Sequence, residues 1–232
     1  MNRNLTATVV MPERRPMFTR DWNISKQFTR WLVARRVSPN AISLAGMAGG
    51  IVAGLALAAT ALPGLASVMC LAGVAGIIVR GLGNLLDGMV AVASGTASPL
   101  GELFNEVPDR LSDIAILIGA GYAAGGNATL GLLAALVAVL VAYVRAEGKV
   151  VGASQQYCGP MAKPGRMVII LLTALYCGLT PAAWQPALTI GKQNLGLMGI
   201  ALGIIVAGGI LTAIRRLNRI AQEASTAYPL KK

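Results

Sequence analysis

The chain has 232 residues and a net charge of +11, and 55% of its residues are hydrophobic while 12% are charged. With a mean hydropathy of +0.65, the composition is too apolar for an ordinary soluble domain. No histidine occurs, which excludes histidine bases and histidine-ligated zinc and leaves carboxylates for acid–base or metal chemistry. The basic residues cluster beside apolar segments, which favours membrane lipid headgroups and not nucleic acid as their partners.

Residues 1–40 form a basic segment that we expect to be cytosolic. Between Met17 and Arg36, apolar residues alternate with basic ones, a pattern typical of an amphipathic helix that lies on a membrane surface. A simple topology anchor explains the same pattern equally well. The sequence Ser38-Pro39-Asn40 follows and is typical of a helix start.

Six apolar segments come next, each close to the roughly 20 residues that a helix needs to cross a bilayer. Four charged residues lie between Leu103 and Asp113, which makes the third segment the least typical. Residues 41–214 are therefore predicted to be an all-α integral membrane domain of six transmembrane helices, followed by a basic tail at 215–232. The segments run over residues 41–62, 65–86, 103–122, 128–144, 167–184 and 195–214.

The distribution of lysine and arginine predicts the orientation. Eight of the twenty basic residues precede the first apolar segment and five follow the last, whereas the links at 63–64 and 125–127 carry no charge. Because positive charge is retained on the cytosolic side, both termini are expected there. The chain is thus predicted to be a multi-pass protein of the cytoplasmic (inner) membrane.

Acidic residues are concentrated at one place. The chain has nine, and five of them fall within 27 residues: Asp87, Glu102, Glu106, Asp109 and Asp113. Ionisable groups at the edge of a membrane usually mark a functional cavity. A charged cytosolic loop, with ion pairs to Arg80 and Arg110, is the alternative interpretation.

The spacing of these residues places oxygen ligands on two helix faces. Asn84 and Asp87 are three residues apart, and Gly101, Asn105, Asp109 and Asp113 recur every four residues. Carboxylate and amide oxygens, without histidine or cysteine, suit hard cations such as Mg²⁺ or Mn²⁺.

The run NLLDGMVAVASGTASPLGELFNEVPD, residues 84–109, resembles the signature D-x2-D-G-x2-A-R-x8-G-x3-D-x3-D of the CDP-alcohol phosphatidyltransferase family. All gaps agree with that signature. Three positions differ, because Asn84 and Asn105 stand for the first and third aspartates and Val92 for the arginine. The matching residues are Asp87, Gly88, Ala91, Gly101 and Asp109.

The resemblance implies a role for each position of the motif. Asp87 and Asp109 would bind Mg²⁺ or Mn²⁺, with Asn84 and Asn105 contributing carbonyl oxygens, and Asp109 would also be the catalytic base. Asp113 continues the same helix stripe and is a further candidate metal ligand. The residues that would leave room for the nucleotide are Gly88, Ala91 and Gly101.

The basic residues Lys163 and Arg166, in GPMAKPGR, are candidates for binding a phosphate. Positive-inside topology alone is the simpler explanation of them. The family resemblance implies that the protein moves a phosphatidyl group from CDP-diacylglycerol to a small hydroxyl acceptor, releasing CMP, in phospholipid biosynthesis. It also implies a homodimer.

Two alternatives remain at this point. The loss of the family arginine at Val92 leaves room for another CDP-linked alcohol as the donor. The two asparagines leave room for a non-catalytic relative that binds lipid or nucleotide.

Overall fold

The computed structural model describes residues 22–227, except Ala97 and Lys192. The first 21 residues of the predicted cytosolic segment, and residues 228–232 of the predicted tail, lie outside the described part. The helices are α1 (Asn23–Ala34), α2 (Pro39–Ala59), α3 (Ala66–Ala93), α4 (Pro99–Tyr122), α5 (Ala128–Val150), α6 (Lys163–Leu179), the short 3₁₀-helix η2 (Ala182–Trp184) and α7 (Leu197–Ala227).

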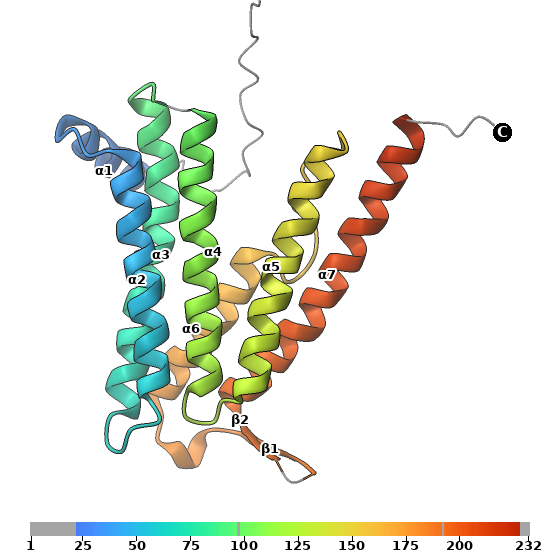
Figure 1. Cartoon of the computed structure of the whole chain (residues 1–232). Helices are drawn as coiled ribbons and strands as arrows, with labels where there is room; N and C mark the ends of the chain where they lie inside the picture. Colours follow the sequence, from blue (N-terminus) through green and yellow to red (C-terminus); the bar gives the residue numbers. More distant parts are fainter. Residues whose placement is uncertain (1–21, 97, 192, 228–232) are drawn as a thin grey trace, which may run out of the picture.

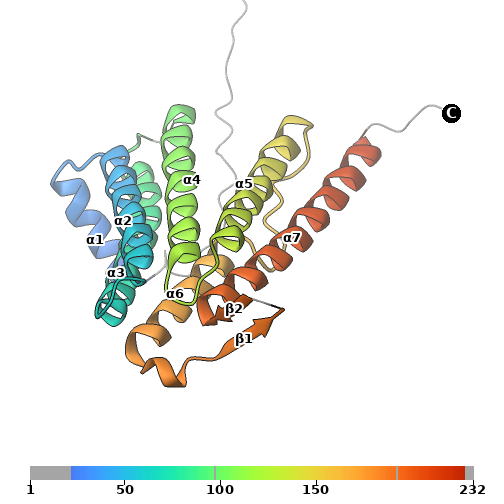
Figure 2. The same cartoon turned by 60° about the horizontal axis from the view of Figure 1, so that its bottom comes forward.

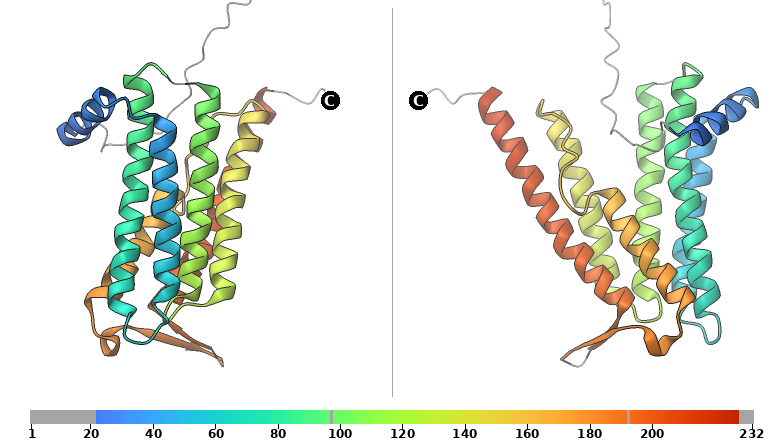
Figure 3. Two further views of the ribbon diagram at one scale, coloured as in Figure 1. Left: turned by 60° about the vertical axis from the view of Figure 1, so that its left-hand side comes forward. Right: turned by 180° about the vertical axis from the view of Figure 1, so that it is seen from behind.

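The long helices form two groups (Figure 1). Helices α2, α3 and α4 run side by side, and α5 and α7 form a second pair that inclines away from them toward the end where the chain terminates (Figure 3). Helix α6 packs against both α3 and α7 and so joins the two groups. Contacts across this junction place parts of α3, α4 and α6 close together.

Polar caps fix where several of these helices begin. Ser38 Oγ accepts a hydrogen bond from the backbone N–H of Ala41 at 3.2 Å, and proline occupies the first position of α2. Ser98 caps α4 in the same way, and the side chain of Asn127 caps α5. Because a cap satisfies N–H groups that have no partner within the helix, these residues set the helix starts.

Small residues let α2, α3 and α4 approach closely. Gly46 of α2 lies against Gly83 of α3, and Gly50 lies against Ser112 of α4. Gly54, which forms a Gly-x3-Gly pair with Gly50, also faces α4. This pair therefore serves packing within the chain, as small residues do between helices in lipid.

Within the described residues, four helices are long and apolar enough to cross a membrane. They are α2, α3, α5 and α7, and the protein is accordingly a multi-pass membrane protein with a helical architecture. Helices α4 and α6 occupy the positions of the third and fifth predicted segments. Charges in the first half of α4, and the 17-residue length of α6, set them apart from the other four.

Helix α1 confirms the predicted helix before the first apolar segment. Its Thr29 and Leu32 are buried, and Thr29 Oγ1 lies 3.8 Å from Met89 Sδ of α3. The neighbouring face, one residue or about 100° around the helix, exposes large apolar side chains, as a helix that lies on a membrane surface does. These are Trp22, Ile24, Phe28 and Trp31.

Two other segments differ from the sequence-based prediction. Helix α6 ends at Leu179, before a loop, η2 and an antiparallel hairpin of β1 (Ala187–Ile190) and β2 (Gln193–Gly196), which lies at the end opposite the C-terminus (Figure 2). Helix α7 continues to Ala227, so the predicted tail is helical over most of its length. The four-residue strands are too short for an alternating pattern to predict them.

The contact between Gly46 and Gly83 gives a test of the packing. A Cβ atom at position 83 would lie 2.9 Å from the Cα atom of Gly46, whereas one at Gly81, on the same helix, would have no neighbour within 4 Å. We expect Gly83→Ala to lower the unfolding temperature in detergent, since overpacking costs about 1–3 kcal/mol. Gly81→Ala should leave it unchanged or raise it, because alanine favours helix. Equal unfolding temperatures for the two variants would contradict the described packing.

Candidate active site

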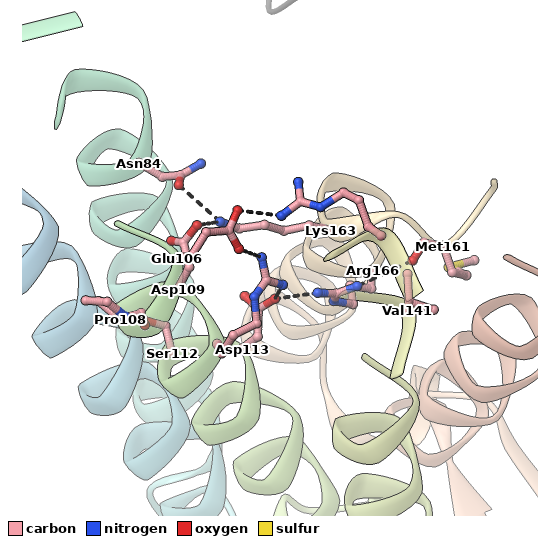
Figure 4. Close-up of polar contacts among 12 residues, drawn as sticks. Asn84, Glu106, Pro108, Asp109, Ser112, Asp113, Val141, Met161, Lys163 and Arg166 are labelled. Carbon is pink, nitrogen blue, oxygen red and sulfur yellow. Dashed lines mark hydrogen bonds and ion pairs between the residues drawn. The ribbon is translucent and has the colours of Figure 1, made fainter. Parts of the chain in front are cut away.

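Polar residues from three helices meet where the two helix groups join (Figure 4). On α3 they are spaced at four and then three residues, which puts them on one helix face. Helix α4 contributes residues every four positions, and α6 contributes two from its first turn. They are Arg80, Asn84 and Asp87 of α3, Asp109 and Asp113 of α4, and Lys163 and Arg166 of α6, and Asn105 lies one turn before Asp109 on α4.

Asp113 lies at the centre of a buried ion-pair cluster. Its Oδ1 atom accepts a hydrogen bond from Arg80 Nη2 at 2.8 Å, and its Oδ2 atom accepts one from Arg166 Nη2 at 2.5 Å. All three side chains are at most 4% exposed. Both carboxylate oxygens are thus bonded to arginines, a geometry that supports a structural ion pair and gives the predicted metal-ligand role no support.

Asp109 lies one turn before Asp113 and shares one of its partners. Arg80 Nη2 donates to Asp109 Oδ1 at 3.0 Å, and Lys163 Nζ contacts Asp109 Oδ2. The same ammonium group donates to Asn84 Oδ1 at 3.0 Å. The structure therefore brings the first and last residues of the sequence motif together around a cation.

Asp87 of α3 is held by a contact that sequence reasoning missed. Ser43 Oγ of α2 donates a hydrogen bond to Asp87 Oδ2 at 2.7 Å, and the Asp87 side chain is buried. Asp87 lies three residues after Asn84, on the same face of α3. Ser43 follows the helix-start sequence, but nothing in that sequence indicates a partner 44 residues away.

Glu106 forms a second ion-pair network on α4. Its carboxylate contacts Arg110 Nη2 at 2.6 Å and Arg145 Nη2 of α5 at 2.5 Å. The Arg145 guanidinium also lies 5.6 Å from the ring centre of Tyr157. The ion pairs of the alternative interpretation, those of Arg80 and Arg110 with acidic residues, are therefore present beside the motif.

The remaining motif residues lie around the cluster. Asn105 is half-buried one turn before Asp109, and the backbone N–H of Gly101 donates to Ser98 Oγ at 3.1 Å in the cap of α4. Gly88 and Ala91 are half-buried near the end of α3. A nucleotide-binding role for Gly88, Ala91 and Gly101 stays a prediction. The side chain of Glu102 lies outside the described part.

Helix α7 holds the loop that leads to Lys163. The backbone N–H of Met161 donates to Thr212 Oγ1 at 3.0 Å, and Arg216 Nε donates to the carbonyl oxygen of Cys158 at 3.0 Å. Farther along α7, Glu223 accepts hydrogen bonds from Ser154, including one from its backbone N–H at 2.8 Å. These contacts fix the start of α6, and with it the two basic residues of the site.

The donor set fits a hard divalent cation in its chemistry. Asn84 and Asp109 direct oxygen atoms at one cation, the ammonium group of Lys163, and the buried Asp87 lies on the same face of α3 as Asn84. Amide and carboxylate oxygens are ligands that Mg²⁺ and Mn²⁺ prefer. Within the described residues, however, three carboxylate or thiolate groups do not converge at one point.

Comparison with known proteins decides the family. The chain is 30% identical over 191 residues to the archaetidylinositol phosphate synthase of Methanothermobacter thermautotrophicus, covering 81% of this chain and 90% of that protein. The chain belongs to the CDP-alcohol phosphatidyltransferase family. It is therefore an enzyme, a transferase of phospholipid biosynthesis. No family model matches the sequence.

Other relatives of this phosphatidyltransferase are similar over most of its length. The phosphatidylinositol phosphate synthase of Streptomyces avermitilis is 28% identical over 219 residues, which cover 92% of this chain and 83% of that protein. The inner membrane protein YnbA of Escherichia coli is 29% identical over 155 residues, covering 67% of this chain and 75% of that protein.

Solved structures support the fold of the phosphatidyltransferase. The Mycobacterium tuberculosis phosphatidylinositol phosphate synthase with bound CDP-DAG has a TM-score of 0.66 and 17% identity, over 86% of this chain and 94% of that one. The same protein in complex with manganese and citrate gives a TM-score of 0.67 and 17% identity, over 85% and 88%. At this identity the likeness concerns the arrangement of the helices.

Asp113 provides a test of the buried cluster. Asp113→Asn would leave the buried guanidinium group of Arg166 without its carboxylate and Arg80 with Asp109 alone, and loss of a buried ion-pair partner typically destabilises a protein by about 3–5 kcal/mol. Glu106→Gln, in the half-exposed network of the same helix, should have a much smaller effect. Unfolding monitored by size-exclusion chromatography after heating would compare them. A larger loss of thermal stability in Glu106→Gln than in Asp113→Asn would contradict the assigned importance of Asp113.

Proposed function

We propose that the protein transfers a phosphatidyl group from CDP-diacylglycerol to a hydroxyl acceptor and releases CMP. The observation that carries this proposal is the meeting of the motif residues Asn84 and Asp109 at Lys163, with the buried Asp87 on the same face of α3 as Asn84. Supporting it, the relatives include phosphatidylinositol phosphate synthases, and one of the solved structures has CDP-DAG bound. Mg²⁺ or Mn²⁺ is the proposed cofactor, since a structural neighbour is in complex with manganese.

In the proposed reaction, Asp109 takes the proton of the acceptor hydroxyl. The acceptor oxygen then forms a bond to the phosphorus atom that bears diacylglycerol, and the bond from that phosphorus to the CMP oxygen breaks. Asp109 is in contact with Arg80 and Lys163, but carboxylate oxygens have about four lone-pair positions, so capacity for a hydroxyl remains. A divalent ion held by Asp87, Asp109, Asn84 and Asn105 would stabilise the charge on the diphosphate.

The two candidate phosphate-binding residues differ in their surroundings. Arg166 is 2% exposed and is paired with Asp113, so its proposed contribution is to position α6. Lys163 is 19% exposed and borders the carboxylates, where its charge can stabilise a substrate diphosphate. Gly88, Ala91 and Gly101 are proposed to leave room for the nucleotide.

Release of CMP tests the proposed function. Purified protein in mixed micelles with Mn²⁺ should release CMP from CDP-diacylglycerol when given the right polyol, with inositol phosphate first in the panel because of the relatives' names. Asp109→Asn should reduce the rate by about 10²- to 10⁴-fold, the usual contribution of a catalytic base. Glu147→Gln, at an exposed carboxylate of α5, is the control and should retain activity.

The products discriminate between the possible donors. CMP release from CDP-choline or CDP-ethanolamine, without release from CDP-diacylglycerol, would overturn the proposed donor and favour another CDP-linked alcohol. Absence of CMP release from every donor and acceptor of the panel would overturn the proposed activity.

We further propose six membrane spans, with α4 and α6 crossing beside the four more apolar helices. In support, the links at 63–65 and 123–127 and the hairpin lie at one end, and the C-terminal end of α3, the start of α4 and the end of α7 lie at the other (Figure 1). The positive-inside rule places both termini in the cytosol, and an inner-membrane relative supports that membrane. The homodimer expected from the family stays a prediction.

Alkaline phosphatase fusions test the number of spans. With six spans, a fusion after Gly125 is outside the cytosol and active, and a fusion after Gly152 is cytosolic and inactive. If only the four more apolar helices cross, both results are reversed, because α5 would then cross in the opposite direction. A green fluorescent protein fused at the C-terminus should fluoresce, which checks the cytosolic terminus.

A further inference from the structure

The ammonium group of Lys163 joins the two helices of the motif. Its Nζ atom donates to Asn84 Oδ1 of α3 at 3.0 Å and contacts the Asp109 carboxylate of α4. Asn84 and Asp109 are the first and last residues of the motif that the family resemblance assigns to metal binding. An amide oxygen and a carboxylate oxygen from separate helices thus meet at one cation, which is the way such groups meet at a bound metal ion (Figure 4).

The position of this ammonium group is fixed from several sides. Lys163 is the first residue of α6, and the preceding Met161 and Cys158 are bonded to α7 through their backbones. One turn later, Arg166 is buried against Asp113. The lysine side chain therefore starts from an anchored backbone and ends between two anchored oxygen atoms, an arrangement that a mobile surface lysine does not have.

The charges near the motif limit how many divalent ions it can hold. Asp87 and Asp109 contribute two negative charges, because Asn84 and Asn105 are neutral where the family has aspartates. Lys163 with one divalent ion supplies three positive charges, and with two divalent ions it would supply five. Affinity for hard cations falls as the ligands lose charge, and neighbouring cations repel each other strongly in a poorly solvated site.

We propose that Lys163 is a built-in cation of the metal-binding set, and that the chain binds one divalent ion beside it instead of two. The inference rests on the proposed function for its choice of metal. In this proposal the ammonium group takes the place that a metal ion would have between Asn84 and Asp109. The two asparagines lower the negative charge of the site to match. Lys163 is in this sense a determinant of metal stoichiometry.

Counting bound Mn²⁺ tests this proposal without substrate. The electron paramagnetic resonance signal of free Mn²⁺ would be measured during titration of the full-length, detergent-solubilised protein. Wild type should bind one ion per chain. Lys163→Met, which removes the charge and keeps most of the side-chain length, should bind a second ion or bind the first at least tenfold more tightly. Lys149→Met, at an exposed lysine of α5, is the control and should match wild type.

Two Mn²⁺ ions bound by wild type would overturn the proposal, and so would unchanged stoichiometry and affinity in Lys163→Met. A second measurement needs no variant. Acetylation of lysines by an N-hydroxysuccinimide ester, followed by mass spectrometry, should modify Lys163 slowly both with and without saturating Mn²⁺, with Lys149 as the internal reference. Faster modification of Lys163 in Mn²⁺ would show that the metal displaces the lysine, which also contradicts the proposal.

These outcomes are separate from those of the CMP assay. An enzyme that releases CMP but binds two Mn²⁺ ions would keep the proposed function and lose this inference. A protein that binds one Mn²⁺ beside Lys163 but releases no CMP would lose the proposed function alone.

Discussion

The pairing of Asp113 with two arginines is the interaction on which the site depends. It joins α3, α4 and α6 through Arg80 and Arg166, and all three side chains are buried. An unpaired charge in an apolar helix bundle would be very unfavourable. The charged residue of each helix therefore needs its partners on the other two helices. Arg80 also holds Asp109, and the proposed catalytic carboxylate therefore takes its position from the same cluster.

This cluster lies where two differently packed groups of helices meet. Between α2, α3 and α4, glycine and serine permit close backbone contact, as at Gly50 and Ser112. Helix α7 instead holds the loop before α6, because Thr212 accepts a hydrogen bond from the Met161 backbone N–H and Arg216 donates one to the Cys158 carbonyl oxygen. The group of α2, α3 and α4 supplies the acidic face, and α6, whose preceding loop is held by α7, supplies Lys163. Any relative movement of the groups would change the distance between that ammonium group and Asp109.

Helix positions and the motif face could be predicted from the sequence, because both depend on local periodicity. Apolar segments of about 20 residues and four-residue spacing on one helix are visible in one dimension. Contacts between side chains of different helices are not visible in the sequence. Asp113 had the spacing of a ligand, yet its role is decided by Arg166, 53 residues away, and Ser43 gave no signal of its contact with Asp87. Spacing identifies which residues share a face, but not the charge of the face opposite them.

The asparagines of the motif illustrate the same limit from the chemical side. Read along the sequence, Asn84 and Asn105 in place of aspartates are only a loss of ligand charge. In three dimensions, one of those amides accepts a hydrogen bond from Lys163, which contributes a positive charge at the same point. A carboxylate at position 84 would have paired with this ammonium group as Asp109 does. The asparagine and the lysine therefore both make the local charge more positive. Both reduce the electrostatic attraction for a second divalent ion while they keep oxygen atoms in place for the first.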